Sequence, residues 1–471
     1  MKTRLSRYFG TKEFYKHALA ISIPMILQNL VTNFVSMLDN IMVGAVGTEQ
    51  MSGVSIVNQF VFVFALTLFG GVSGAGIFGT QFFGKGDHEG QKYTVRFRLI
   101  LVTIVTVIFA VIMLLWGDDL IRLFLSEDDA PEMIEATLQY GHDYLMIMLL
   151  GMVPFGIGIA YSSVVRECGE TKIPMIGSIA AIGVNLFLDY GLIFGNFGMP
   201  QMGVKGAAIA TVIAKTIEAL VVIIWAHTHP QKNRYIEGLY KGFTIPSKLT
   251  KQILKKGCPL LLNEFLWSIG MSVIAQSYSV RGLDVVAARN ISSTLVNLFN
   301  VVFVQLGGAI GIIIGTRLGA GELEKAKEED RQLIVFSFLV TMVVMVLIMP
   351  FVYVFPLVYN TTDEIRQLSS YIILMQAFAM PLWAFTNACY FTLRSGGKTG
   401  ITFLFDFVYT WAIQIPLAFI LTRATTLDFK IIFAIVTYSE ILKVVLGYFL
   451  VRSGIWVVNL VGNSKSSKNV V

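Results

Sequence analysis

The chain has 471 residues, of which 55% are hydrophobic and only 14% are charged, and its mean hydropathy is +0.70. Soluble globular domains carry about 25% charged residues, so this composition excludes a single soluble domain, a disordered chain and a disulfide scaffold. The formal net charge of +6 is typical of basic cytoplasmic loops in a membrane protein, and we expect no nucleic-acid partner.

Apolar segments that are long enough to cross a membrane recur along the whole chain. One helical span needs about 20 mostly apolar residues. The pattern predicts an all-α integral membrane protein with twelve transmembrane helices. The predicted spans are 17–45, 50–82, 94–116, 134–161, 173–195, 205–228, 252–279, 287–316, 332–355, 367–391, 400–422 and 430–452.

Basic residues are distributed unevenly between the two sides of the predicted membrane. If the N-terminus lies inside, 27 Lys and Arg fall in or beside the inner segments and 7 fall in or beside the outer loops. Positively charged loops stay on the cytoplasmic side. We therefore expect a multi-pass protein of the cytoplasmic (cell inner) membrane with both termini in the cytoplasm.

The chain repeats itself at an offset of 235 residues. Pro24 corresponds to Pro259, and the segments GIFGTQFFGKGDHEGQ and GIIIGTRLGAGELEKA are related in sequence. Each half holds six predicted helices, so the two pseudo-symmetric lobes have the same orientation and suit alternating access to a site between them. We predict an N-terminal lobe at 1–228, a cytoplasmic linker at 229–251, and a C-terminal lobe with a cytoplasmic tail at 252–471.

We interpret six carboxylates as lying within the membrane, where an ionised group costs about 2.5–3.5 kcal/mol at the helix centre. They are Asp39, Asp189, Glu218, Glu264, Asp406 and Glu440. Glu218 follows Lys215 by three residues. Glu440 likewise precedes Lys443 by three residues, and we interpret both as members of intrahelical ion pairs. The other four are candidates for binding a cation.

Asp39 and Asp189 lie at similar depth in the N-terminal lobe. Asn185 precedes Asp189 by one helical turn, so the two side chains share one face. Two carboxylates that converge in a low dielectric cannot both stay ionised without a cation or a proton between them. Asp39, Asn185 and Asp189 therefore form a candidate coupling-ion site, for Na⁺ as the metal or for H⁺. The alternative is two acids that are solvated separately by a water-filled cavity.

Two carboxylates of the predicted second lobe are candidates for binding a cation. Glu264 follows Pro259 by five residues and is a candidate for a proton, a sodium ion or an organic cation. Alternatively, the Glu264 carboxylate faces a water-filled vestibule or pairs with a lysine. Asp406 stands among aromatic residues in FLFDFVYTW, which suit a lipophilic cation. Alternatively, those aromatic residues serve in helix packing or lipid contact and do not bind a cation.

Several motifs occur in a characteristic order along the chain. A proline begins the first span, DNIMVGAVGTEQMSGVS follows from Asp39, and GTQFFGKGD ends the second span. The loop RECGETKIP, the N-x-x-x-D motif at 185–189 and GVKGAAIAT at 203–211 come later. Together these motifs resemble the multidrug and toxic compound extrusion (MATE) family of secondary antiporters. The resemblance implies twelve helices in two lobes and export of amphipathic, often cationic compounds, driven by inward flow of sodium ions or protons.

The resemblance also implies roles for individual residues. The acid of the family's first span falls on Asp39. The Asn and Asp that are typical of DinF-like members fall on Asn185 and Asp189. The Thr that accompanies them in some members falls on Thr211, and the acid of the seventh span in NorM-like members falls on Glu264.

The chain departs from the family pattern at two positions. Trp383 stands where NorM-like members carry an Asp in the tenth span. Tyr190 follows the acid of the fifth span, where Pro is common. The chain thus mixes features of two branches and does not indicate whether the ion is sodium or a proton.

An antiporter, a flippase and an enzyme are the three classes of function considered for this chain. We predict a secondary-active multidrug antiporter that exchanges small amphipathic or cationic compounds for Na⁺ or H⁺, and that acts as a monomer among membrane lipids. A flippase for a lipid-linked substrate is the alternative. The chain contains no GxSxG, HExxH or GxxxxGK[ST] motif, so we expect neither an enzyme nor a cofactor.

Overall fold

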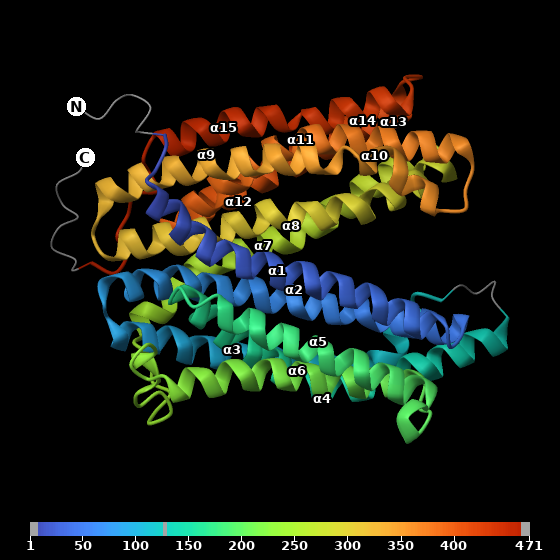
Figure 1. Cartoon of the computed structure of the whole chain (residues 1–471), viewed down its shortest axis with the longest axis horizontal. Helices are drawn as coiled ribbons and strands as arrows, with labels where there is room; N and C mark the ends of the chain where they lie inside the picture. The colour runs from blue at the N-terminus through green and yellow to red at the C-terminus, as the bar shows by residue number, and fades with distance from the viewer. Residues whose placement is uncertain (1–7, 126–129, 463–471) are drawn as a thin grey trace. The chain divides into compact units, whose positions relative to one another are not determined.

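The computed structural model describes residues 8–125 and 130–462. These residues form helices and connecting turns, with no strand among them. Eleven helices in the described ranges are long and apolar enough to cross a membrane (Figure 1). They are α1 (Lys12–Gly44), α2 (Thr48–Lys85), α3 (His88–Arg122), α4 (Pro131–Glu167), α5 (Lys172–Phe194), α6 (Val204–Thr228), α7 (Ser247–Ser279), α8 (Leu283–Gly319), α9 (Leu323–Ile348), α11 (Asp363–Ser395) and the continuous stretch Thr399–Ala424. Both chain ends, predicted to be cytoplasmic, lie outside the described residues.

The stretch Thr399–Ala424 is not one uniform helix. It consists of α12 (Thr399–Val408), the π-helical η5 (Tyr409–Gln414) and α13 (Ile415–Ala424). Pro416, near the start of α13, has no amide hydrogen to donate to the preceding turn, and a π-helical turn accommodates such a break.

Two further predicted spans are also interrupted. Helix α9 ends just before Pro350, and the short helices α10 (Phe351–Val354) and η4 (Phe355–Val358) replace the predicted end of that span. The twelfth predicted span consists of α14 (Phe429–Tyr438) and α15 (Glu440–Arg452), which are separated at Ser439.

The chain divides into two compact units, which we call the first and the second unit. The first unit comprises Ile23–Gly79 and Asp87–Leu254, and in it α4 packs along α3 and α6, and α6 packs along α5. The second unit comprises Met1–Ser22, Thr80–Gly86 and Lys255–Val471, and in it α11 packs along α8, α9 and α15. The lobe boundaries proposed from the sequence stay a prediction.

Each unit has its own apolar core. Val57, Leu68 and Leu145 are fully buried in the first unit. Ile348 and Ala377 are fully buried in the second unit. Because lipid tails are as apolar as these side chains, close van der Waals packing rather than exclusion of water holds the helices of each unit together.

The segment between α6 and α7 is more than a solvated connector. It contains a short turn of helix, η3 (Arg234–Ile236), that follows the buried Asn233. Tyr235 and Leu239 are fully buried against Val95 of α3 and Val164 of α4. The predicted linker is therefore docked on the first unit by a small apolar cluster of its own.

We expect Arg96→Met to loosen this docked linker. Arg96 of α3 donates hydrogen bonds of 2.9–3.2 Å to the carbonyl oxygens of Gly238, Leu239 and Thr244. Methionine retains most of the apolar contact but none of these bonds, so the free energy of local opening falls by about 2 kcal/mol. Limited trypsin digestion should cut the linker faster. Arg122→Met, in the last turn of α3, is the control and should leave the rate unchanged.

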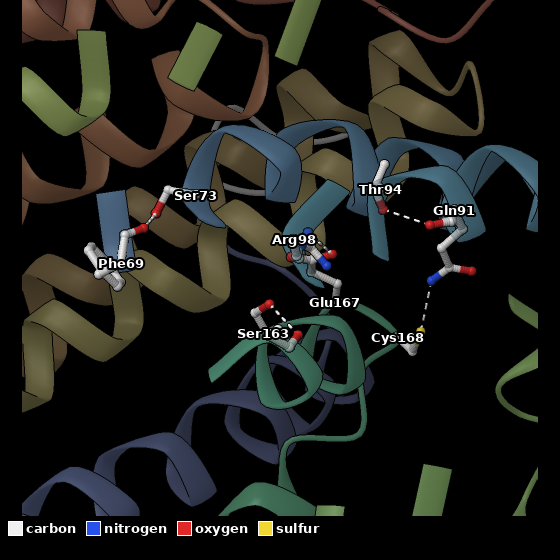
Figure 2. Close-up of polar contacts among 9 residues, drawn as sticks. Phe69, Ser73, Gln91, Thr94, Arg98, Ser163, Glu167 and Cys168 are labelled. Carbon is white, nitrogen blue, oxygen red and sulfur yellow. Dashed lines mark hydrogen bonds and ion pairs between the residues drawn. The ribbon is translucent and has the colours of Figure 1, made fainter. Parts of the chain in front are cut away.

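A buried ion pair joins α3 to the end of α4. Arg98 is fully buried, and its Nη2 donates to Oε1 and Oε2 of Glu167 at 2.7 and 2.8 Å (Figure 2). Gly76 and Gly79 of α2 face this pair, and an added Cβ at Gly79 would lie 2.3 Å from Glu167 Oε2. The two glycines thus provide the space that the ion pair occupies.

Cys168, Cys258 and Cys389 are free thiols. Cys168 follows α4, and its Sγ accepts a hydrogen bond of 3.0 Å from Gln91 Nε2 (Figure 2). Burial raises the pKa of the Cys168 thiol to about 12. This thiol therefore stays protonated and unreactive at neutral pH.

Residues 453–462 close over the ends of three helices in the second unit. Gln81 Nε2 of α2 donates to the carbonyl oxygen of Ser395 at 2.9 Å, and Gln81 Oε1 accepts from the Leu460 amide at 2.7 Å. Trp456 in the same segment is only 2% exposed. The last turn of α2 is thereby fastened to α11 and to the segment that follows α15.

Candidate functional site

A cavity of about 380 Å³ lies inside the first unit, between α1, α2, α4, α5 and α6. Its walls are mostly apolar and include Val35, Val54, Met148 and Phe155. Volumes of this order, with apolar walls and a few polar groups, are typical of small-molecule sites. The cavity is therefore the candidate binding site of the first unit.

All four site residues predicted for the N-terminal lobe line this cavity: Asp39 of α1, Asn185 and Asp189 of α5, and Thr211 of α6. Asn185 and Asp189 are 5% and 1% exposed. The close packing of α5 on α6 explains how these helices bring their polar groups together. At Gly206 an added Cβ would lie 2.7 Å from the backbone of Leu192, so only glycine permits this approach.

Several polar atoms at this site have no hydrogen-bonding partner among the described residues. They are Asp39 Oδ1, Asn185 Nδ2 and both carboxylate oxygens of Asp189. The carboxyl groups of Asp39 and Asp189 are close enough to interact electrostatically. Buried carboxylates without a partner are costly, and bound cations or protons remove that cost.

The available donors favour an alkali cation or a proton over a transition metal. Carboxylate, amide and hydroxyl oxygens are hard ligands. No group of three or more His, Cys, Asp or Glu is arranged to hold a metal within residues 8–125 and 130–462. The oxygen atoms of Asp39, Asn185, Asp189 and Thr211 fit a sodium ion, and the two carboxylates fit a proton equally well.

The cavity also contains polar residues that sequence reasoning did not assign to the site. Tyr144 of α4 is 4% exposed, and its hydroxyl donates to Asn58 Oδ1 of α2 at 3.3 Å. The same hydroxyl lies near Thr211, and both acids act on it electrostatically. Asn58 is one of several polar residues in the predicted spans, and no local pattern distinguishes it from the others. Tyr144 carried no signal at all, because a tyrosine in an apolar helix is usually part of the packing.

Lys215 and Glu218 also line the cavity. The predicted ion pair is present, with 3.0 Å between Lys215 Nζ and Glu218 Oε2. The sequence indicated the pair from its spacing of three residues. It did not indicate that both side chains face the same cavity as Asp39.

Glu218 is the end of a chain of hydrogen bonds inside the first unit. Ser178 Oγ donates to Glu218 Oε1, and Gln28 Nε2 donates to Ser178 Oγ at 2.6 Å. Arg166 Nη2 in turn donates to Gln28 Oε1 at 2.6 Å. Gln28 and Ser178 are 6% and 3% exposed, so the chain is shielded from solvent and holds the Glu218 carboxylate in one position.

The two candidates of the second unit differ in their surroundings. Asp406 forms an ion pair of 2.6 Å with Lys443 and accepts a hydrogen bond of 3.1 Å from Asn263. The predicted partner of Lys443, Glu440, is more distant at 3.8 Å. Phe407 and Trp411 are among the side chains that close around Asp406 and leave no space for a ligand. The cation beside this carboxylate is thus the protein's own lysine.

Glu264 on α7 is half-buried, and the charges of Arg394 and Asp406 act on it. The structure thus brings Glu264 and Asp406 into one electrostatic environment within the second unit. Among the described residues, the space beside Asp406 is much smaller than the cavity of the first unit.

Comparisons with known proteins show which family and which relatives this chain resembles. The MatE family model matches residues 24–191 and 259–420. A relative from Thermotoga maritima, described as a probable multidrug resistance protein NorM, is 27% identical over 419 residues, which cover 87% of this chain and 86% of the relative.

Solved structures share the fold. A multidrug resistance MATE family transporter of the MOP superfamily in an outward-facing conformation has a TM-score of 0.83 at 20% identity, over 96% of this chain and 99% of that one. A second structure is a MOP superfamily transporter from Pyrococcus furiosus, described as having a binding pocket of reverse polarity. Its TM-score is 0.81 at 19% identity, over 96% of this chain and 98% of that one. These matches confirm the predicted fold class, an all-α membrane protein with twelve transmembrane helices in two six-helix lobes.

Proposed function

The chain belongs to the MatE family of membrane transporters, and on that premise we propose that it exports small amphipathic cations in exchange for Na⁺ or H⁺. It is a transporter and not an enzyme. In this proposal the chain lies in the cytoplasmic membrane with both termini in the cytoplasm and acts as a monomer. Two lobes joined by the linker 229–251 alternate in exposing the site to either side.

The observation that supports the proposal is the set of unpartnered carboxylate oxygens in the cavity of the first unit. Asp39 Oδ1 and both oxygens of Asp189 are buried and have no hydrogen-bond donor within the described part of the chain. Two such carboxylates bind a positive charge strongly. If the coupling ion and the organic cation use the same two carboxylates, binding of one displaces the other, and exchange follows.

The walls of the cavity support an amphipathic substrate. Met148 and Phe155 supply apolar contact, and the acids supply the attraction for positive charge. Asp39, Asp189 and Glu218 are the acids of the lining, and Lys215 is the basic residue. An excess of acids disfavours a flippase whose substrate carries phosphate, so that alternative receives no support from this cavity.

Transport by purified protein in liposomes tests the proposal. Ethidium is a suitable substrate because its charge does not depend on pH. We expect a sodium gradient or a proton gradient, each imposed separately, to drive ethidium transport. We expect Asp39→Asn or Asp189→Asn to reduce the transport rate at least about ten-fold, because removal of one charge at a shared site costs of the order of 1.4 kcal/mol.

Asp118→Asn is the matched control, because Asp118 is exposed and pairs with His142 outside the cavity. Its transport rate should equal that of the unmodified protein. Full transport by both Asp39→Asn and Asp189→Asn is the result that contradicts the proposed site.

A further inference from the structure

Lys215 places a basic side chain, paired with Glu218, inside the cavity that is proposed to bind cations. Its side chain is 32% exposed, and the space that it faces is this cavity. A fixed ammonium weakens the binding of any other cation nearby. A basic side chain at this place therefore suggests a role in cation exchange, and this role rests on the proposed function.

The ammonium of Lys215 has few fixed contacts. It donates to Glu218 Oε2 at 3.0 Å and lies 5.2 Å from the centre of the Phe155 ring. An ammonium has three donors, and one of them is used in this way. The side chain is long and flexible, so the ammonium is free to turn within the cavity.

The Asp39 carboxylate is within the electrostatic reach of this ammonium. Lys215 is among the charges that act on Asp39. Lys215 also follows Thr211 by one turn of α6, so both side chains share one face of that helix. Asp39 Oδ1 has no partner in the part of the chain that the structure describes, and it is an acceptor that Lys215 can serve.

Glu218, in contrast, is held in place. Ser178 and Gln28 tie its carboxylate into the buried chain of hydrogen bonds that ends at Arg166. The pair thus consists of a fixed acid and a mobile base. The charged and titratable side chains around the cavity are Asp39 of α1, Tyr144 and Arg166 of α4, Asp189 of α5, and Lys215 and Glu218 of α6, and α2 contributes the neutral Asn58.

The membrane-embedded lysine of the second unit shows a different arrangement. Lys443 lies between Asp406 at 2.6 Å and Glu440 at 3.8 Å, and its side chain is 15% exposed. It also lies over the rings of Phe405 and Tyr409 at 5.1 and 5.4 Å. Lys443 is enclosed on all these sides, whereas Lys215 has an acid on one side and open cavity on the other.

We propose that Lys215 is a resident counter-cation, which pairs with Asp39 when no external cation is bound and returns to Glu218 when one arrives. One ammonium compensates one carboxylate, so the empty site then contains one uncompensated buried carboxylate fewer. The exchange is a rotation of the side chain between two carboxylates, so no covalent bond is made or broken. Lys215 thereby weakens cation binding enough for the cation to be released and exchanged.

A double-mutant cycle on cation binding tests this role. The measurement is the dissociation constant of ethidium for purified protein, obtained by fluorescence anisotropy at fixed pH and ionic strength. We expect Lys215→Gln to tighten binding about ten-fold, because the competing charge is gone. We expect Glu218→Gln to weaken binding about ten-fold, because the lysine then stays with Asp39. In the double variant, Glu218→Gln should change binding less than about three-fold.

Non-additivity is the decisive readout, because a lysine that acts only as a fixed charge gives additive effects. The proposal is overturned if the effects on the dissociation constant are additive. It is also overturned if Lys215→Gln and Glu218→Gln change that constant in the same direction. Lys205→Gln is the control: this lysine is on the same helix but pairs with Asp143 outside the cavity, and its loss should not alter binding.

Asp39→Asn separates this proposal from the proposed function. If Asp39→Asn leaves ethidium binding unchanged, the acidic site itself is wrong and the role of Lys215 falls with it. If Asp39→Asn weakens binding but the cycle is additive, the site stands and the role of Lys215 alone is wrong. Lys215→Arg keeps the charge and should stay close to the unmodified protein.

Discussion

We expect Glu167→Gln to lower the free energy of unfolding by about 3–5 kcal/mol, because it leaves the buried Arg98 guanidinium without its counter-charge. Arg98 Nε and Nη1 already have no hydrogen-bonding partner among the described residues, so the Glu167 contact is its main compensation. Gly76 and Gly79 pack directly on the pair, so no other charged side chain can take that place. Thermal unfolding in detergent should show a markedly lower Tm.

A neighbouring glutamate gives the matched control. Glu170, three residues later, pairs with Lys232 at 2.6 Å, but the side chains are 29% and 53% exposed. Exposed pairs contribute about 0–1 kcal/mol, so Glu170→Gln should barely move Tm. The double variant Arg98→Met with Glu167→Leu should recover most of the loss, since it removes both charges together. An equal Tm for Glu167→Gln and Glu170→Gln contradicts this account of the buried pair.

We expect Gly84→Ala or Gly319→Ala to destabilise the second unit by about 3 kcal/mol or more. An added Cβ would lie 1.9 Å from the carbonyl oxygen of Thr316 at Gly84, and 1.9 Å from that of Gln81 at Gly319. The last turns of α2 and α8 therefore touch through their backbones. Backbone atoms cannot move aside as a flexible side chain does, so the helices must separate.

The glycines two residues later serve a different purpose. Gly86 and Gly321 have φ of +73° and +77°, and an added Cβ at either would meet no atom within 4 Å. Alanine there costs only the strain of the left-handed conformation, about 1–2 kcal/mol. Gly183→Ala, in open space within α5, should be neutral or slightly stabilising. Thermal unfolding of the purified variants should rank them in this order, and a Gly84→Ala protein as stable as Gly183→Ala contradicts the close approach.

The repeated G-x-G motif shows how far sequence reasoning reaches. Its recurrence at an offset of 235 residues indicated the duplication correctly, because related halves retain the residues that their folds require. The reason for each glycine was not visible. Gly84 and Gly319 are needed for contacts between helices distant in sequence, whereas Gly86 and Gly321 are needed for local turns.

The acidic residues show the same limit. Hydropathy and helical spacing predicted that Asp39, Asn185 and Asp189 belong together, and all of them line one cavity. The partners of Lys215 and Lys443 were expected at a spacing of three residues, and both contacts are present. The nearer partner of Lys443, however, is Asp406 on another helix. No local pattern predicts such a pair, because it depends on how α12 packs against α15.

The sequence by itself determined the spans, the duplication and the family, since each depends on composition or on spacing along the chain. Only the tertiary structure decided which polar groups share a cavity, which are neutralised by a lysine, and where backbones touch. These outcomes depend on distances between helices, and the electrostatic and steric energies that govern them change steeply over a few ångströms.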